Sequence, residues 1–319
     1  MSTLALTDGA VNSGAIVVGL LAVWLTGCDS QPKSAEQRQA QARSHLQSLS
    51  AAGLLAGARG EVQVASVRQV TPVATRWSSA GEPFCWAELK SGTGAPAGYL
   101  AWQATGQHAL LDFSLEGLTE LAAPSAKALA GVPPIQQFPI KGTDGRPVAS
   151  GCVPTAGGSL MAFWSNRGTF DWQADDSHEG LVRRLRDRLP MAVLADVEGY
   201  TDGKMALAGA FPEPLVAGLR ADAAQYRVSV DIQLVRFSDQ VLRTEISEGR
   251  PALLMCNVLV PRKPELTWGH AVVAVGYAEV AGKSFVGIID NFYVSQQPGT
   301  VRWIAADRCS ALVLVRPAE

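Results

Sequence analysis

The sequence predicts an α+β fold in which one half of the molecule is helical and the other half is an antiparallel sheet. Apolar residues recur at helical spacing after position 152 and again over residues 181–189. Apolar or alternating runs of strand length occupy residues 228–234, 252–260 and 285–290. One helix is expected before the first of these strands, over residues 211–226, and one after it, over residues 239–248.

The overall composition is that of a globular protein. The chain has 319 residues, of which 47% are hydrophobic and 18% charged, and its net charge is −2. This length allows two domains, and the near-neutral charge gives no indication of a nucleic-acid partner. Five cysteines are an odd number, which argues against a complete disulfide framework. No cysteine–histidine spacing is typical of zinc, so no metal or cofactor is expected.

The amino terminus has the pattern of a signal peptide. Residues 15–25 form an almost uninterrupted apolar run of 11 residues. A membrane span needs roughly 17–25 residues, so this run better suits the core of a signal peptide. No Lys or Arg precedes it, although signal peptides normally carry positive charge there. The alternative interpretation is a buried hydrophobic helix.

The run ends in Leu-Thr-Gly-Cys at Cys28, which resembles the lipobox of bacterial lipoproteins. In that family the cysteine becomes the lipid-modified first residue. The resemblance implies a signal peptide over residues 1–27 and a membrane-anchored protein of the bacterial cell envelope that faces the periplasm or the exterior. The polar residues 28–50 are then expected to be a tether that is partly helical near its end.

Residues 51–130 are predicted to form a small separate module, and residues 131–319 a second domain. Within the module we expect a small sheet from residues 61–67, 84–89, 98–102 and 109–114. An Ala/Leu-rich helix interrupted by Pro124 is expected to follow over residues 115–130.

The central feature of the second domain is Cys152, which follows a glycine and opens a helix-like run. Pro154 suits the first helical turn, where its missing N–H costs nothing. The unpaired N–H groups and the dipole at a helix start favour a negative charge, and the thiolate is the nucleophilic form of cysteine. The alternative interpretation is a small buried residue at the start of a core helix.

A second stretch, Trp-Gly-His-Ala-Val-Val-Ala-Val-Gly-Tyr, places His270 on an apolar strand, and a following strand ends in Asp290 and Asn291. This order of residues resembles the papain-like cysteine peptidases, and among them the streptopain-like and the double-glycine-leader (bacteriocin-processing) peptidases. Gly-Cys-Val-Pro-Thr-Ala around Cys152 resembles the streptopain nucleophile motif. The resemblance runs from Gln137 to the C-terminus, and residues 98–114 resemble the pro-region sheet of the streptopain branch more weakly.

The resemblance implies a papain-like fold with Cys152 as nucleophile and His270 as its base. The amide of Gln137, or of Gln136 in its place, would help to hold the oxyanion. Papain-like enzymes place Asn after the strand and double-glycine-leader peptidases use Asp. Since adjacent strand residues point to opposite faces, only one of Asn291 and Asp290 can orient the imidazole, and Asn291 is slightly favoured.

The size of the pKa shift expected for a papain-type cysteine indicates that Cys152 needs a histidine partner. Papain-type cysteines have a pKa of about 3–4 against an ordinary value of about 8.5. That difference corresponds to roughly 5–7 kcal/mol, whereas a helix terminus supplies about 0.3–1 and at most roughly 2 kcal/mol. A protonated imidazole must supply most of the rest, and His270 is the histidine in a suitable context.

The remaining cysteines are interpreted as structural. Cys85 is expected to serve packing. Cys256 and Cys309 are expected to be small core residues, and an oxidising compartment would allow a disulfide between them.

The predicted function is therefore a lipid-anchored thiol peptidase that acts on a peptide or protein substrate. One alternative is a catalytically silent surface lipoprotein that binds peptide in the same cleft. The other is a related cysteine-dependent acyltransferase or amidase.

Overall fold

The computed structural model describes residues 34–55, 61–73, 81–115, 126–142, 145–169, 172, 177–194, 206–260, 263–292 and 300–318. Within them, the chain forms a mixed α+β structure with five α-helices and one large antiparallel sheet, as the sequence predicts at that level. None of the described helices combines the length and apolarity that a membrane span requires. The predicted signal peptide and Cys28 lie outside the described residues.

The amino-terminal strands form an antiparallel meander. Its members are β1 (Val62–Val70), β2 (Phe84–Ser91), β3 (Pro96–Gln103) and β4 (Leu110–Leu115). Each pairs with the next, so the four strands predicted for this module are present. Residues 116–125, where most of the predicted helix falls, are outside the described residues. Residues at the end of that prediction form strand β5 (Ala126–Ala128) instead, because they pair with β12.

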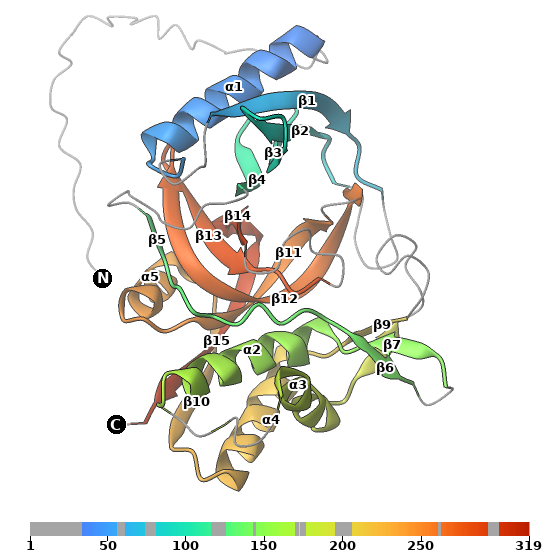
Figure 1. The fold of residues 1–319 in the computed structure, drawn as a ribbon, viewed down its shortest axis with the longest axis vertical. Coiled ribbons are helices and arrows are strands. Elements are labelled where there is room, and N and C mark those ends of the chain that lie inside the picture. The colour runs from blue at the N-terminus through green and yellow to red at the C-terminus, as the bar shows by residue number, and fades with distance from the viewer. Residues whose placement is uncertain are drawn as a thin grey trace, which may run out of the picture.

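The segment expected to be a tether forms helix α1 (Ala35–Ala51) over most of its length. Ser34 accepts a hydrogen bond from the Gln37 backbone N–H, and the Gln37 side chain accepts one from the Ser34 backbone, which is a capping box. The apolar side chains at i, i+4 and i+7 are buried against the amino-terminal strands: Ala42, Leu46 and Leu49. Figure 1 shows this helix lying across the sheet. The helix is longer than the partly helical end expected for the tether, because tertiary packing stabilises a helix of low apolar content.

The helical half contains α2 (Cys152–Asn166), α3 (His178–Asp187) and α4 (Pro212–Gln225). Two short ribbons lie beside them: β6 (Pro139–Lys141) with β7 (Pro147–Ala149), and β8 (Ala192–Leu194) with β9 (Leu207–Gly209). Helix α5 (Asp239–Ser247) packs separately, against β12 and β5. Figure 1 shows α2, α3 and α4 grouped below the sheet.

The second part of the large sheet contains six strands of the carboxy-terminal half. They are β10 (Val230–Arg236), β11 (Ala252–Val260), β12 (Lys263–Val280), β13 (Lys283–Ile289), β14 (Val301–Ala305) and β15 (Cys309–Pro317). A one-turn 3-10 helix (Ala306–Arg308) precedes the last strand. The long β12 carries His270 near its middle.

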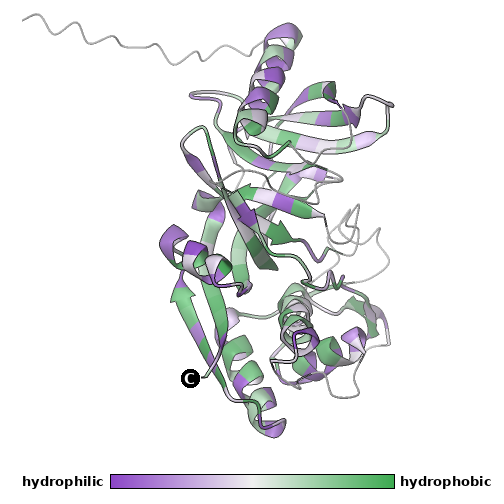
Figure 2. Ribbon diagram, turned by 60° about the vertical axis from the view of Figure 1, so that its left-hand side comes forward, coloured by the Kyte–Doolittle hydropathy of each residue, from purple (hydrophilic) through white to green (hydrophobic). Residues whose placement is uncertain are grey.

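The sheet is covered on both faces, which explains the apolar strands. Leu253 of β11 belongs to the core beneath α2, α3 and α4, whereas its neighbour Leu254 belongs to the core beneath α5. Because successive strand residues point to opposite faces, a strand buried on both sides becomes a continuous apolar run, as residues 252–260 are. Figure 2 shows the corresponding hydrophobic colouring along the strands and along α2.

The amino-terminal strands and the carboxy-terminal strands belong to one sheet. The strand order is β1-β2-β3-β4-β14-β13-β12-β11-β15-β10, with β5 paired to β12. The junction is the β4–β14 pair, where Phe113 lies opposite Trp303 and Asp112 opposite Ile304. Thus the predicted boundary at residue 130 falls directly after a segment that pairs with β12 of the second half. The module of residues 51–130 shares its hydrophobic core with β12, β13 and β14.

Candidate active site

Cys152 is the first residue of α2 and is half-buried. Gly151 precedes it with a φ of 95°, a conformation that L side chains rarely adopt. A Cβ at Gly151 would also lie 2.6 Å from Met191 Cε and 3.2 Å from the Ala208 carbonyl oxygen. The glycine therefore lets the chain turn sharply into the helix and leaves the thiol at the helix start.

The loop before Cys152 is held by buried hydrogen bonds. The Ser150 hydroxyl lies 3.0 Å from the Thr155 hydroxyl, which donates to the Gly151 carbonyl at 2.6 Å. From α3, Arg186 Nη1 donates to the Ser150 carbonyl at 2.7 Å. This close approach of α3 depends on Gly157 of α2, since a Cβ there would lie 2.4 Å from Leu185 Cδ2. The position of Cys152 is thus determined by the helices around it.

His270 lies on β12, opposite Cys256 of β11, and is buried. Its Nε2 is 3.2 Å from Asp290 Oδ1. Its ring stacks on Phe292 with centroids 4.0 Å apart and an interplanar angle of 7°. Nδ1 is buried and has no hydrogen-bond partner among the described residues. The imidazole is therefore fixed through one nitrogen, and the other is available to a neighbour.

Asp290, rather than the slightly favoured Asn291, contacts the imidazole. Asp290 Oδ1 also accepts the Phe292 backbone N–H at 3.0 Å, and Oδ2 accepts from Arg302 Nη1 at 2.9 Å. The burial of the neighbouring residues explains why Asp290, and not Asn291, reaches the imidazole. Ile288 and Phe292 are buried in the core beneath α5, whereas Ile289 is buried beneath α2. Alternation along an extended chain therefore turns Asp290 and Asn291 to opposite faces.

Asn291 joins the start of α2 to β12. Its Nδ2 donates to the Cys152 carbonyl at 3.1 Å and to the Ala271 carbonyl at 2.9 Å. Its Oδ1 accepts from Gln137 Nε2 at 3.3 Å. The preference for Asn291 as the orienting residue is therefore not supported by these contacts, which assign it to aligning α2 with the strand that carries His270.

Gln137 lies beside this group and is buried, with its backbone N–H donated to the Asn291 carbonyl at 3.0 Å. Its side-chain amide is partly used by Asn291. Gln136, the alternative from the sequence, has a buried Nε2 with no hydrogen-bond partner among the described residues. Both glutamines thus stay candidates for an oxyanion donor.

The electrostatic environment favours a charged pair. Burial by itself would lower the pKa of His270, but Asp290 and Cys152 more than offset this and raise it to about 9. Burial opposes ionisation of Cys152 as well. The neighbouring His270 and the backbone N–H groups of Ala271 and Val153 nevertheless hold the pKa of the thiol below its ordinary value. The pKa of Asp290 is also lowered: burial opposes this, and His270 and Arg302 outweigh it.

The other cysteines lie in a different environment. Burial raises the pKa of the Cys256 thiol well above its usual value, and it also raises that of Cys309. These two residues lie opposite each other on β11 and β15, and both are free thiols in the structure. The suggested disulfide is therefore not formed. Among the described residues, no cluster of three or more His, Cys, Asp and Glu side chains could hold a metal ion.

Sequence reasoning missed Arg302 and Asp112. Each is a charged residue with apolar residues on both sides in a strand, in Val-Arg-Trp-Ile-Ala and in Leu-Leu-Asp-Phe-Ser-Leu. A charge between apolar neighbours on a central strand must be buried and paired, so this pattern is the signal that could have identified them. It would not have named their partners.

Comparisons with known proteins do not assign the chain to a family. No protein-family model matches it, and no curated protein matches it. The contacts of Cys152, His270 and Asp290 are therefore the evidence from which a function is inferred.

The pKa differences predict that the Cys152 thiol is alkylated faster than the other cysteines. At about pH 5–6, iodoacetamide should modify Cys152 at least about tenfold faster than Cys256 or Cys309 in the folded protein, because each pKa unit changes the thiolate fraction tenfold. Cys85 should also react more slowly than Cys152, because its side chain is buried. Peptide mapping by mass spectrometry after short exposure measures the four rates. Equal rates would contradict a lowered pKa at Cys152.

Proposed function

We propose that this protein is a thiol peptidase of papain-like fold that hydrolyses peptide bonds with Cys152, His270 and Asp290. The observation that carries the proposal is the position of His270, which couples electrostatically to Cys152 and contacts Asp290 at 3.2 Å. A cysteine at a helix start and a histidine on an antiparallel sheet packed against that helix also support a papain-like arrangement.

In the first step, the Cys152 thiolate attacks the carbonyl carbon of the scissile peptide bond. A C–S bond forms and the π electrons of the carbonyl move to oxygen. The backbone N–H of Cys152 at the helix start and the side-chain amide of Gln137 or Gln136 would stabilise this oxyanion. The His270 imidazolium then gives its proton to the amide nitrogen as the C–N bond breaks, which releases the amine and leaves a thioester.

In the second step, neutral His270 takes a proton from water, and the resulting hydroxide attacks the thioester carbon. The C–S bond breaks and Cys152 leaves as the thiolate. His270 is again the imidazolium, so the resting charges are restored. Asp290 keeps the imidazole in place and stabilises its charged form in both steps.

The two alternatives differ from this function in ways that can be measured. A silent peptide-binding protein does not need a lowered thiol pKa beside a raised imidazole pKa, so those shifts favour a catalyst. An acyltransferase or amidase would use the same groups but a different acceptor or a different amide. The peptidase is preferred because the resemblance in sequence is to peptidases.

The proposal is tested by labelling with an epoxide inhibitor of thiol proteases, followed by peptide mapping and by digestion of a peptide library. We expect one label, on Cys152, and cleaved library peptides. Cys152→Ala is the control for the label. A labelled protein that transfers acyl groups to added amines without cleaving any library peptide would support an acyltransferase, and an unlabelled protein would contradict a catalytic thiol.

We further propose that lipid on Cys28 anchors the enzyme at the cell envelope. Cys28→Ser should then abolish lipid attachment and leave the protein unprocessed or released from the membrane fraction. Metabolic labelling with a palmitate analogue measures this, with Cys85→Ser as the matched control. Undiminished label in Cys28→Ser would refute the anchor.

A further inference from the structure

The active-site histidine is connected to the amino-terminal strands by buried charged side chains. Asp290 Oδ2 accepts from Arg302 Nη1 at 2.9 Å. Arg302 in turn donates to both carboxylate oxygens of Asp112, from Nε at 3.0 Å and from Nη2 at 2.5 Å. Tyr99 donates its hydroxyl hydrogen to Asp112 Oδ1 at 2.9 Å. All of these side chains are buried.

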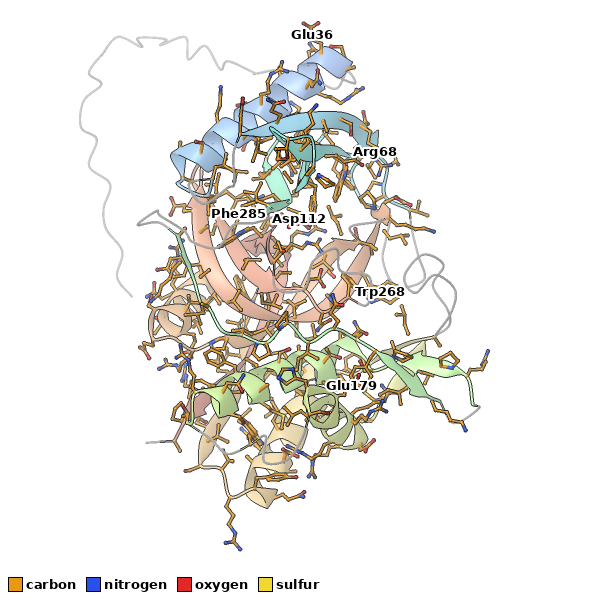
Figure 3. All side chains as sticks on the ribbon, viewed as in Figure 1. Glu36, Arg68, Asp112, Glu179, Trp268 and Phe285 are labelled. Atoms are coloured by element: carbon orange, nitrogen blue, oxygen red, sulfur yellow. The ribbon has the colours of Figure 1, made fainter. Side chains whose placement is uncertain are left out.

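This network crosses the junction between the two halves of the sheet. Tyr99 and Asp112 lie on β3 and β4, while Arg302 lies on β14 and His270 on β12. Figure 3 labels Asp112 of β4 and Phe285 of β13 in this part of the molecule. The aromatic ring of Phe113 packs there against Phe285 and Trp303, with centroids 5.3 Å and 6.1 Å away. The amino-terminal strands are thus packed against the elements that carry the site.

The ion pair between Arg302 and Asp290 depends on Asp112, which balances the charge of Arg302. The guanidinium is buried, and apart from the carboxylates its recorded hydrogen bond is from Nη2 to the Leu259 carbonyl at 2.7 Å. With Asp112 present, the positive charge of Arg302 is balanced, and Asp290 retains its full effect on the imidazole. With Asp112 neutral, Asp290 would be the remaining carboxylate paired with Arg302 among the described residues, and Arg302 would compete with His270 for it.

We propose that Asp112 is a positioning residue of the active site, acting through Arg302 on Asp290, and that the amino-terminal strands are a permanent part of the enzyme. This inference rests on the proposed function for its catalytic meaning. It differs from the pro-region role that the sequence resemblance suggests for residues 98–114, because a pro-region is removed and Asp112 would leave with it.

The proposal predicts a change in the titration of His270. The groups that face its imidazole are Cys152 from α2 and Asp290 after β13, with Cys256 opposite it on β11 and Arg302 behind Asp290. Asp112→Asn leaves one uncompensated positive charge behind Asp290. That charge disfavours the imidazolium, so the pKa of His270 should fall by roughly one unit. NMR titration of the four histidines in labelled protein measures it, with His270 assigned by substitution.

A second variant separates charge from orientation. Asp112→Asn combined with Arg302→Met removes one charge of each sign, so the pKa of His270 should return to its original value. In this double variant Asp290 lacks the guanidinium that held its Oδ2. Its kcat should therefore be about 10-fold to 100-fold below that of the wild type, while KM is unchanged. Because this variant leaves no unpaired charge, it also serves if Asp112→Asn alone does not fold.

Glu245→Gln is the matched control. Glu245 is equally buried and is paired with two arginines, Arg250 and Arg316, but these groups do not contact the site. The control should lose stability without moving the pKa of His270 or kcat. If Asp112→Asn loses stability and leaves the His270 titration where it was, or if the double variant keeps full kcat, Asp112 is a purely structural residue and the proposal is overturned.

Whether the amino-terminal strands remain in the active enzyme is tested on protein isolated from cells. Intact mass and amino-terminal sequencing of inhibitor-labelled protein from cells should show that residues 61–115 are still present. A labelled, active species that lacks them would overturn the proposal. The failure of the proposed function is distinguishable, because in that case wild-type Cys152 takes no inhibitor and has no selective reactivity, whatever the Asp112 variants do.

Discussion

Replacement of Cys152 with alanine is expected to lower peptide hydrolysis by at least about 10⁴-fold while the protein stays folded, because the nucleophile acts as a unit with its base. Cys152 is half-buried at the start of α2, and alanine keeps its helical conformation and most of its volume. The measurement is kcat/KM on any peptide that the wild type cleaves, with the thermal unfolding temperature measured in parallel.

Cys256→Ala is the comparison for this result. Cys256 is also buried near His270, where its Sγ lies 3.7 Å from the His270 carbonyl oxygen, but burial raises the pKa of its thiol. The Cys256→Ala variant should therefore retain most of the wild-type activity. Comparable turnover in Cys152→Ala and the wild type would show that hydrolysis does not use a cysteine nucleophile at this position.

Replacement of Asp290 with asparagine is expected to lower kcat by about 10²-fold to 10⁴-fold, as loss of the carboxylate behind a catalytic histidine does elsewhere. Asp290 raises the pKa of His270, which is about 9 in the intact site. Without that charge the imidazolium loses its proton at a lower pH. Activity, which requires the imidazolium, should therefore fall at a lower pH on the alkaline side of the profile than it does in the wild type.

Asn291→Ala should behave differently. Asn291 ties the Cys152 carbonyl to β12, so its loss should lower the unfolding temperature and, through misalignment, the rate. It should not move the alkaline side of the pH profile, since its side chain carries no charge. A large pH shift in Asn291→Ala together with a normal profile in Asp290→Asn would reverse the assignment made from the contacts.

Local sequence pattern determined much of the fold. The apolar run of residues 252–260 is β11 with the same bounds, and the helix that opens at Cys152 begins at that residue. These features depend on neighbours within a few positions: alternation, continuous burial, and a glycine followed by a proline near the first turn. Cys152, His270 and the Asp290–Asn291 pair were identified through the resemblance to papain-like peptidases, and the structure brings these residues together.

Tertiary structure decided the partners. Asp290 and Asn291 are equivalent in local pattern, and the face that each presents follows from how β13 pairs within the sheet. Asp112 and Arg302 are 190 positions apart and meet because β4 pairs with β14. The same pairing joins the predicted module of residues 51–130 to the predicted domain of residues 131–319 in one sheet. Packing against that sheet also stabilises α1. Such choices depend on strand order and register, because a buried charge takes the partner that register brings within hydrogen-bond distance.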